Sequence, residues 1–298
     1  MSLLRSGPQD TTTPIVPVQR GSQPPLPQPR EPAEAEQPRL RAGRELLLVT
    51  VLFLVYKFGR MAATGHVATA FDNANDVWRL ERDMWLPNEL SLQNLFFCHM
   101  CLVRGANIYY AAVHFPATAA FLLWTYRFRP AHYLWARRAL AGITAAALAM
   151  HLLTPLAPPR MLQITGMIDT ARRYGPAVYG SPKTDTLSNQ YAAMPSLHVG
   201  WALMVAIGLI AATRSRWRWL WLAHPVVTVA VVVATANHYW LDAIVAVLLL
   251  MVALIILDTP AKAAQKARSR REACYSATAR SSPDRPHQVP VSSPSPPT

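Results

Sequence analysis

The sequence predicts an all-α fold: a bundle of six transmembrane helices, with an amphipathic helix at its outer face and a disordered tail at each end. Composition supports this prediction, because 52% of the 298 residues are hydrophobic and only 15% are charged. Long uncharged stretches recur between residues 46 and 257. Stretches of about 18 or more apolar residues are what a helix needs to cross a bilayer. The composition therefore argues against a single-span or water-soluble enzyme.

Both ends of the chain are polar and rich in proline. Residues 1–44 hold nine of the 26 prolines, residues 259–298 hold seven, and the first apolar stretch begins only at Leu46. Such segments cannot bury enough apolar surface to offset the entropy of ordering, so we predict two disordered tails and no signal peptide. Residues 45–258 are the predicted membrane-embedded domain.

The charge distribution predicts the topology. An even number of spans puts both tails on one side, and the tails and loops of that side hold 20 of the 29 Lys and Arg residues. The two long segments of the other side, 65–105 and 157–195, hold seven. The positive-inside rule then predicts a protein of the cell membrane whose two tails lie on the cytoplasmic side. The predicted spans are about 46–64, 106–126, 137–156, 196–213, 219–236 and 240–258.

The net charge of +13 also raises the question of nucleic-acid binding. The basic residues lie between apolar runs and not on one folded face, so we predict no nucleic-acid partner. A basic cluster just after the last span is instead expected to contact anionic lipids at the cytoplasmic face. This cluster consists of Lys262, Lys266, Arg268, Arg270 and Arg271.

The outer segment 65–105 contains two further features. Apolar residues recur at helical spacing from His66 to Trp85, which predicts an amphipathic helix that lies in the membrane interface, packs across the ends of the spans, or does both. Cys98 and Cys101 form a C-x-x-C pair that no second pair completes as a zinc site. We expect two small side chains near a membrane surface, with an optional disulfide.

Three polar clusters fall at the outer ends of the spans. Thr154–Arg160 closes the third span, Tyr191–His198 opens the fourth, and Ala236–Asp242 joins the fifth and sixth. They lie far apart in the sequence, but the alternating topology brings them to one membrane face. Because polar residues at the mouth of a span are costly unless paired, the clusters predict a functional site.

In the third cluster, His238 and Asp242 are four residues apart, so on a helix they would lie on one face within hydrogen-bond reach. A carboxylate that accepts the proton of Nδ1 fixes the tautomer and leaves Nε2 as nucleophile or base. The alternative is a structural ion pair that caps the last helix.

The second cluster places Pro195 where the first turn of a helix is expected. Ser196 and His198 would then lie beside unpaired backbone N–H groups, which together form a binding site for an anion such as phosphate. His198 can protonate a leaving oxygen from this position. Taken alone, the same residues are typical of simple helix capping.

In the first cluster, the guanidinium of Arg160 matches phosphate oxygens in a bidentate way. The alternative role is contact with lipid headgroups at the interface. Together the clusters supply a nucleophile, its orienting carboxylate, an acid and a cation, which are the roles that phosphoryl transfer requires.

Pro195-Ser196-Leu197-His198 and His238-x-x-x-Asp242, in this order and at the ends of paired spans, resemble the type-2 phosphatidic acid phosphatase superfamily over roughly residues 45–258. The resemblance implies a six-helix bundle and chemistry that needs no metal or other cofactor. It implies that His238 is the nucleophile that forms a phosphohistidine, that Asp242 orients it, and that His198 is the general acid. Ser196 and Arg160 would bind the phosphoryl oxygens.

The sequence departs from the most widespread motif pattern of this superfamily, and these departures indicate one branch of it. Leu197 replaces a Gly, and Val231 and Val232 replace a Ser-Arg pair. Leu153 stands where a Lys is usual and Met161 where a Pro is usual, so two basic residues of the pattern are missing. Ala-Pro-Pro-Arg, Met-Pro-Ser-Leu-His and His-Tyr-x-x-Asp are instead similar to the branch around inositol phosphorylceramide synthase and its bacterial relatives. The candidate replacements for the missing cations are Arg172, Arg173 and Lys183.

We therefore predict a membrane enzyme that acts on a lipid-borne phosphate ester at the outer face. The branch favours inositolphosphotransferase-like transfer to a lipid alcohol, whereas the presence of water favours plain hydrolysis of phosphatidic acid or a polyprenyl phosphate. Outside the enzyme class, a transporter could use His114, His151 and His198 as a polar path, although these residues gather at one face. The remaining alternative is a catalytically inactive scaffold whose function resides in its tails.

Overall fold

The structure, a computed structural model, describes residues 42–62, 67–176 and 190–281. These residues form helices and no strand, and a single isolated bridge pairs Leu156 with Ala192. The predicted all-α fold is confirmed for the described part of the chain.

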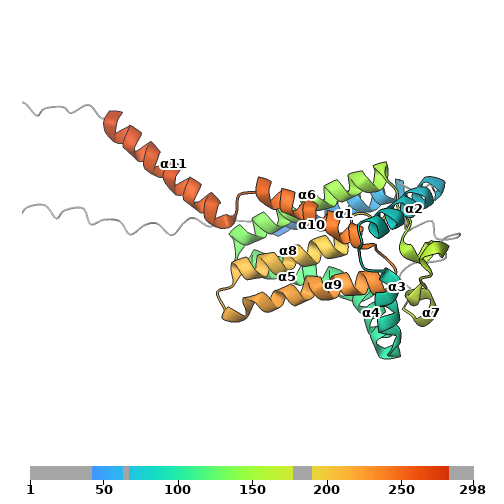
Figure 1. The fold of residues 1–298 in the computed structure, drawn as a ribbon. Coiled ribbons are helices and arrows are strands. Elements are labelled where there is room, and N and C mark those ends of the chain that lie inside the picture. Colours follow the sequence, from blue (N-terminus) through green and yellow to red (C-terminus); the bar gives the residue numbers. More distant parts are fainter. Residues whose placement is uncertain (1–41, 63–66, 177–189, 282–298) are drawn as a thin grey trace, which may run out of the picture. The chain divides into compact units, whose positions relative to one another are not determined.

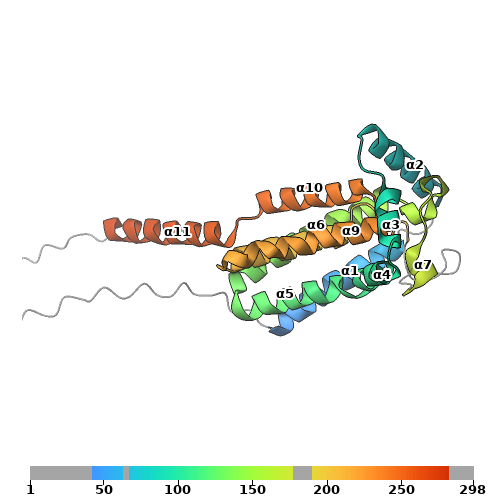
Figure 2. The ribbon, with the colours of Figure 1, turned by 60° about the horizontal axis from the view of Figure 1, so that its bottom comes forward.

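The long helices of the bundle run side by side in both views (Figures 1 and 2). Helix α8 (Leu197–Ala212) is central, because it contacts α5 (His114–Phe128), α6 (Pro130–Leu153), α9 (Ala223–Ala234) and α10 (Trp240–Ile256). A further helix, α1 (Ala42–Ala62), packs against α6. Helix α8, which begins at the second polar cluster, is therefore surrounded by helices that include α6, α9 and α10. The first polar cluster follows α6, and the third lies between α9 and α10.

Small residues let α8 approach its neighbours closely. Gly208 faces the ring of Phe121 in α5, and Gly200 faces Ile143 of α6 and Ala246 of α10. Contacts of this kind are typical of helices that pack in membranes, where van der Waals contact between close backbones drives association.

Each predicted span coincides with helical structure, but two of the spans are not single α-helices. The predicted span 106–126 is divided at Val113 between α4 (Met100–Ala112) and α5. Pro116 lacks the N–H that would bond to the carbonyl oxygen four residues earlier, so one continuous helix is interrupted here. The predicted span 219–236 begins as the 3-10 helix η3 (Arg216–Leu222) before α9.

Two stretches of the described residues are long and apolar enough to cross a membrane. They are Arg216–Ala234 and Trp240–Ala273, while α8 is apolar but shorter. The arrangement of six membrane spans therefore stays a prediction.

The predicted amphipathic helix of the outer segment is present as α2 (Val67–Asp83). Ala70 and Ala74 are buried in one cluster with Leu156 and Tyr239. In addition, the backbone N–H of Ala157 donates to the carbonyl oxygen of Ala70 at 3.0 Å. Helix α2 thus packs across the segments that carry the polar clusters, as one of the two expected arrangements requires. Downstream of it, Cys98 and Cys101 are exposed free thiols.

The C-terminal region differs from its prediction. We expected a disordered tail from residue 259, but Pro260–Ser281 forms the helix α11 (Figure 1). The segment is rich in Ala and in Arg and Lys, which are strong helix formers, and Pro260 occupies the first helical position, where proline is tolerated. The rest of this predicted tail, and residues 1–41 of the other, lie outside the described residues.

Candidate active site

A pocket at one end of the bundle gathers all three polar clusters. Its walls come from α4, α5, α6 and α8, from the segments that follow α6 and precede α8, and from the turn before α10. The residues that line it are Tyr110, His114, Phe115, His151, Pro158, Arg160, Gln190, Ala192, Ala193, Pro195, Leu197, His198, Trp201, Asn237 and His238.

The imidazole of His238 is held at one nitrogen by two acceptors. Its Nδ1 lies 2.9 Å from the carbonyl oxygen of Ala193 and 3.2 Å from Oδ2 of Asp242. A carbonyl oxygen can only accept, so Nδ1 carries a proton, and in the neutral ring the lone pair is then on Nε2. The structure therefore makes Nε2 of the neutral ring available as a nucleophile or base.

Asp242 is completely buried at the third position of α10. Its Oδ2 also accepts the backbone N–H of Tyr239 at 2.9 Å. We expected His238 and Asp242 on one helix face, but α10 begins at Trp240 and His238 precedes it. The contact forms because Asp242 folds back over the positive end of its own helix, where a carboxylate is favoured.

His198 is the second residue of α8 and packs among aromatic rings. Its ring centroid lies 5.8 Å from that of His238. It also lies 4.4 Å from the ring of Tyr110, which stacks on it, and 4.4 Å from the ring of His114. The two imidazoles predicted to act in catalysis therefore line the same pocket.

Ser196 caps α8 in the position expected, but its side chain lies elsewhere than predicted. The residue is completely buried, it does not line the pocket, and its Oγ has no hydrogen-bond partner in the described part of the chain. Its backbone N–H donates to the carbonyl oxygen of Asp242 at 3.1 Å. Pro195 precedes the cap instead of occupying the first turn, and it lines the pocket.

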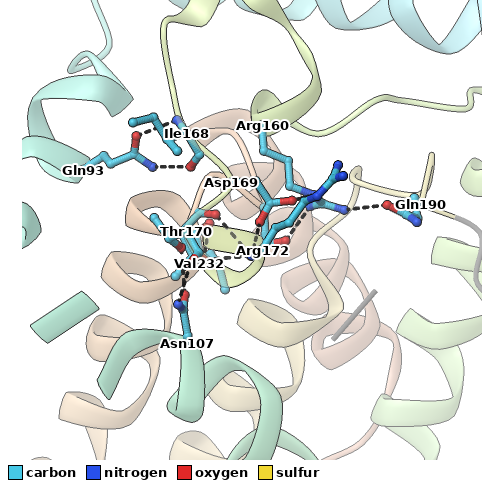
Figure 3. Close-up of polar contacts among 11 residues, drawn as sticks. Gln93, Asn107, Arg160, Ile168, Asp169, Thr170, Arg172, Gln190 and Val232 are labelled. Carbon is cyan, nitrogen blue, oxygen red and sulfur yellow. Dashed lines mark hydrogen bonds and ion pairs between the residues drawn. The ribbon is translucent and has the colours of Figure 1, made fainter. Parts of the chain in front are cut away.

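Arg160 is held by acceptors from separate segments (Figure 3). Its Nη2 lies 3.4 Å from Oε1 of Gln190, its Nε lies 3.5 Å from Oδ2 of Asp169, and its Nη1 donates to Oδ1 of Asn237. Its backbone N–H donates to the carbonyl oxygen of Ala236 at 3.0 Å. Among the described residues that line the pocket, Arg160 is the one Lys or Arg.

The candidate replacements for the missing cations do not join Arg160 there. Arg172 and Arg173 are exposed in the short helix α7 (Thr170–Tyr174), and Lys183 lies outside the described residues. His114 and His151, which the transporter alternative assigns to a polar path, are buried and line the pocket.

Two buried amides anchor the segment that carries Arg160 and Asp169 (Figure 3). Gln93 bonds to the backbone N–H of Ile168 at 2.9 Å and to its carbonyl oxygen at 3.0 Å. Asn107 donates to the carbonyl oxygen of Thr170 at 3.0 Å and accepts the Thr170 hydroxyl at 2.7 Å. Asn107 is an amide within a largely apolar helix, whereas Gln93 lies among other polar residues and carries no such signal.

The contacts of two polar residues that line the pocket could not be predicted from the sequence. Gln190 carries no signal in the sequence, because it belongs to no motif. Asn237 lies within the third polar cluster, where no motif assigns a role to it, and its side chain contacts Arg160.

The pocket thus holds an imidazole whose Nε2 carries the lone pair when the ring is neutral, a second imidazole and a buried guanidinium. These groups suit attack on phosphorus, proton transfer to a leaving oxygen and stabilisation of negative charge. The described residues include no group of three or more His, Cys, Asp or Glu side chains placed to hold a metal ion.

A family model, that of the PAP2 superfamily, matches residues 75–256 of this chain. The matched region covers more than half of the sequence and contains all five predicted site residues. No curated protein and no solved structure matches the chain.

Proposed function

The chain belongs to the PAP2 superfamily, and on that premise we propose that it is an integral membrane enzyme that cleaves or transfers the phosphoryl group or phospho-headgroup of a lipid phosphate ester. Family membership supports lipid-phosphate chemistry of the phosphatase or phosphotransferase type. The observation that carries the proposal for this chain is the Nδ1 of His238, which donates to Ala193 and Asp242, so that the lone pair of the neutral ring lies on Nε2.

The proposed reaction has two steps through a phosphohistidine. Nε2 of His238 attacks phosphorus, the bond from phosphorus to the ester oxygen breaks, and protonated His198 gives its proton to the leaving alcohol. In the second step, water or a lipid hydroxyl attacks the phosphorus, neutral His198 takes the proton of the attacking oxygen, and the bond to Nε2 breaks. Asp242 orients His238 and stabilises the positive charge that its ring carries in the intermediate.

Arg160 is the proposed contact for the phosphoryl oxygens. Its guanidinium supplies a charge that does not depend on pH and a fork of N–H donors that fits phosphate. Ser196 belongs to the proposed phosphate site as the residue at the start of α8. Because its hydroxyl is buried and its own backbone N–H donates to the carbonyl oxygen of Asp242, we assign its contribution to the N-cap position of α8, whose first-turn N–H groups favour an anion.

The proposed topology has six spans, both termini in the cytoplasm and the active site on the outer face of the cell membrane. Large apolar side chains exposed on the outside of the bundle support it, because lipid covers such surfaces at no cost. Leu123 of α5 is 69% exposed, Val226 of α9 is 67% exposed and Ile255 of α10 is 79% exposed. The exposed basic residues of α11 would then contact anionic lipids at the cytoplasmic face.

The proposed acceptor is a lipid alcohol, as in the inositolphosphotransferase-like branch that the three motifs resemble. The alternative is water, which makes the protein a lipid phosphate phosphatase. The two alternatives use the same His238, His198 and Arg160 and differ only in which hydroxyl reaches the phosphohistidine.

Product analysis in mixed micelles tests the proposal. Phosphatidic acid, a polyprenyl phosphate and phosphatidylinositol are each offered to the purified protein, with and without diacylglycerol or ceramide, beside a His238→Ala variant. Release of free phosphate that the variant loses indicates a phosphatase, and a new phospholipid that depends on the acceptor indicates a transferase. A His238→Ala variant with full activity on every substrate would refute the assignment, and the absence of product in every mixture would favour the transporter or scaffold alternatives.

A further inference from the structure

The chain leaves α2 through a left-handed turn at Trp85. The backbone N–H of Trp85 donates to the carbonyl oxygen of Arg82 at 3.1 Å, and the backbone N–H of Leu86 donates to the carbonyl oxygen of Glu81 at 3.0 Å. This pair of hydrogen bonds is a Schellman motif, in which the residue with the left-handed backbone is usually glycine. Trp85 takes this position with a φ of 57°. A residue with a large side chain is strained in that conformation, because its Cβ approaches the backbone too closely.

Packing within the protein does not explain why a tryptophan occupies this position. The side chain of Trp85 is 93% exposed, more than any other large apolar side chain of the described residues. Ala236, the other non-glycine residue with a positive φ in this part of the chain, is completely buried, so packing around its methyl group accounts for its conformation. Both the strain of Trp85 and the exposure of its indole to water cost free energy, which points to contact with something outside the protein.

The side chains around Trp85 match the boundary between lipid headgroups and acyl chains. Leu80 in the last turn of α2 and Met84 just after it are each half exposed. Arg79 and Asp83 are exposed among them. Tryptophan is enriched at this boundary, because its ring favours the acyl chains while its N–H reaches polar groups. Charged side chains are accommodated among headgroups, whereas they are depleted from the core of a protein–protein interface.

The attachment of α2 to α10 places this end of α2 beside a surface suited to lipid. The carboxyl of Glu81 accepts the backbone N–H of Leu241, in the first turn of α10, at 2.7 Å. Three and seven residues further along the same side of α10, Ile244 and Leu248 are exposed. Residues Trp240–Ala273 are long and apolar enough to cross a membrane. Lipid that covers the exposed side of α10 would therefore extend to its first turn, where α2 is attached.

We propose that Trp85 anchors the end of α2 in the membrane, with its indole at the boundary between phospholipid headgroups and acyl chains in the leaflet on the active-site side. The anchor holds the end of α2 at a fixed depth, and Glu81 holds the first turn of α10 at the same depth. The partner of this surface is a phospholipid and not a second protein. The inference rests on the membrane location of the chain and uses none of the catalytic roles.

The test measures the depth of the Trp85 indole in a bilayer. The full chain is reconstituted into phosphatidylcholine vesicles whose acyl chains carry bromine, which quenches tryptophan fluorescence, either near the headgroup or near the chain end. The chain holds nine tryptophans, so the emission of Trp85 is taken as the difference between the wild type and a Trp85→Gly variant. Trp78→Phe is the matched control, because Trp78 belongs to the same helix and packs against the buried cluster of Ala70 and Ala74.

We expect the emission of Trp85 to lose most of its intensity with bromine near the headgroup, and less with bromine near the chain end. Acrylamide added to the water should quench it only weakly. The emission of Trp78, obtained in the same way, should be quenched less than that of Trp85 by the shallow bromine. If Trp85→Gly does not fold, Trp85→Phe gives the same difference and keeps the backbone under the same strain.

Three outcomes would overturn the inference. Quenching by acrylamide and by neither brominated lipid would place the indole in water, and quenching by none of the reagents would mean that protein covers it, such as a second copy of the chain. Stronger quenching by the deep bromine, or equal quenching of Trp78, would show that Trp85 is not an anchor at the boundary. None of these results changes the proposed roles of His238 and Arg160, which the product analysis tests separately.

Discussion

Glu81 accepts a hydrogen bond from the backbone N–H of Leu241 at 2.7 Å, across 160 positions of the sequence. Leu241 is the second residue of α10, and Asp242 follows it. The first N–H groups of a helix have no partner within the helix, so the carboxyl of Glu81 satisfies one of them and ties α2 to the helix that carries Asp242. Glu81 is completely buried, and Arg82 beside it pairs with Glu89 at 3.0 Å.

This contact predicts a pH dependence of stability. Burial, with a smaller contribution from the neighbouring Glu89, raises the pKa of Glu81 from an ordinary value of 4.5 to about 9. Between these two pH values the unfolded carboxyl has lost its proton while the folded one keeps it. The stabilisation is therefore complete below pH 4.5 and decreases as the pH rises toward 9, by up to ~1.4 kcal/mol per pH unit for one proton.

Glu81→Gln removes this titration and keeps an oxygen that can accept from Leu241. We expect its stability to change less than that of the wild type between pH 5.5 and 8.5, so the difference between the two proteins grows in favour of Gln as the pH rises. Unfolding temperatures of both proteins in detergent across this range provide the measurement. Parallel curves for the two proteins would show that Glu81 does not titrate in this window.

Asp242→Asn tests how the tautomer of His238 is maintained. The carbonyl oxygen of Ala193 accepts from Nδ1 at 2.9 Å independently of Asp242, so the asparagine variant should keep the proton on Nδ1. The asparagine variant does lose the negative charge beside the phosphohistidine. We expect a fall in kcat of roughly 10²- to 10³-fold with KM little changed, and a larger loss for His238→Ala. Equal inactivity of the two variants would indicate that Ala193 does not fix the ring.

Gly208→Ala tests the close approach of α8 to α5. An added Cβ would overlap the ring of Phe121, so the variant should lose about 1–3 kcal/mol of stability, as overpacked cores do. Gly142→Ala in α6 is the matched control, because no atom lies within 4 Å of its added Cβ. Thermal unfolding in detergent compares the two. Phe121→Leu should restore part of the stability in the Gly208→Ala background, and an undisturbed Gly208→Ala single variant would contradict this packing.

The sequence predicts the parts of this protein that depend on local pattern. Apolar runs mark the bundle helices, and the helical spacing of apolar residues marks α2. His198, His238 and Arg160 come together because alternating helices bring their ends to one side, and spacing along the chain is enough to anticipate that.

Contacts between distant segments were not predictable in this way. Nothing near Glu81 indicates that it would meet Leu241, and nothing near Gln190 indicates a contact with Arg160. The hydroxyl of Ser196 was placed wrongly because a cap position fixes the backbone of a residue and not the direction of its side chain. The helix α11 was missed because proline content outweighed the helix propensity of its Ala, Lys and Arg residues.

Trapping of the covalent intermediate tests the central claim most directly. The protein is mixed with a lipid whose phosphate is radiolabelled, quenched within the first turnover, and digested to locate the label, with His238→Ala in parallel. The substrate is the lipid that gives product in the micelle assay. We predict label on His238 that is labile in acid and stable in base, and none in the variant. Turnover without label, or label on another residue, would contradict the account.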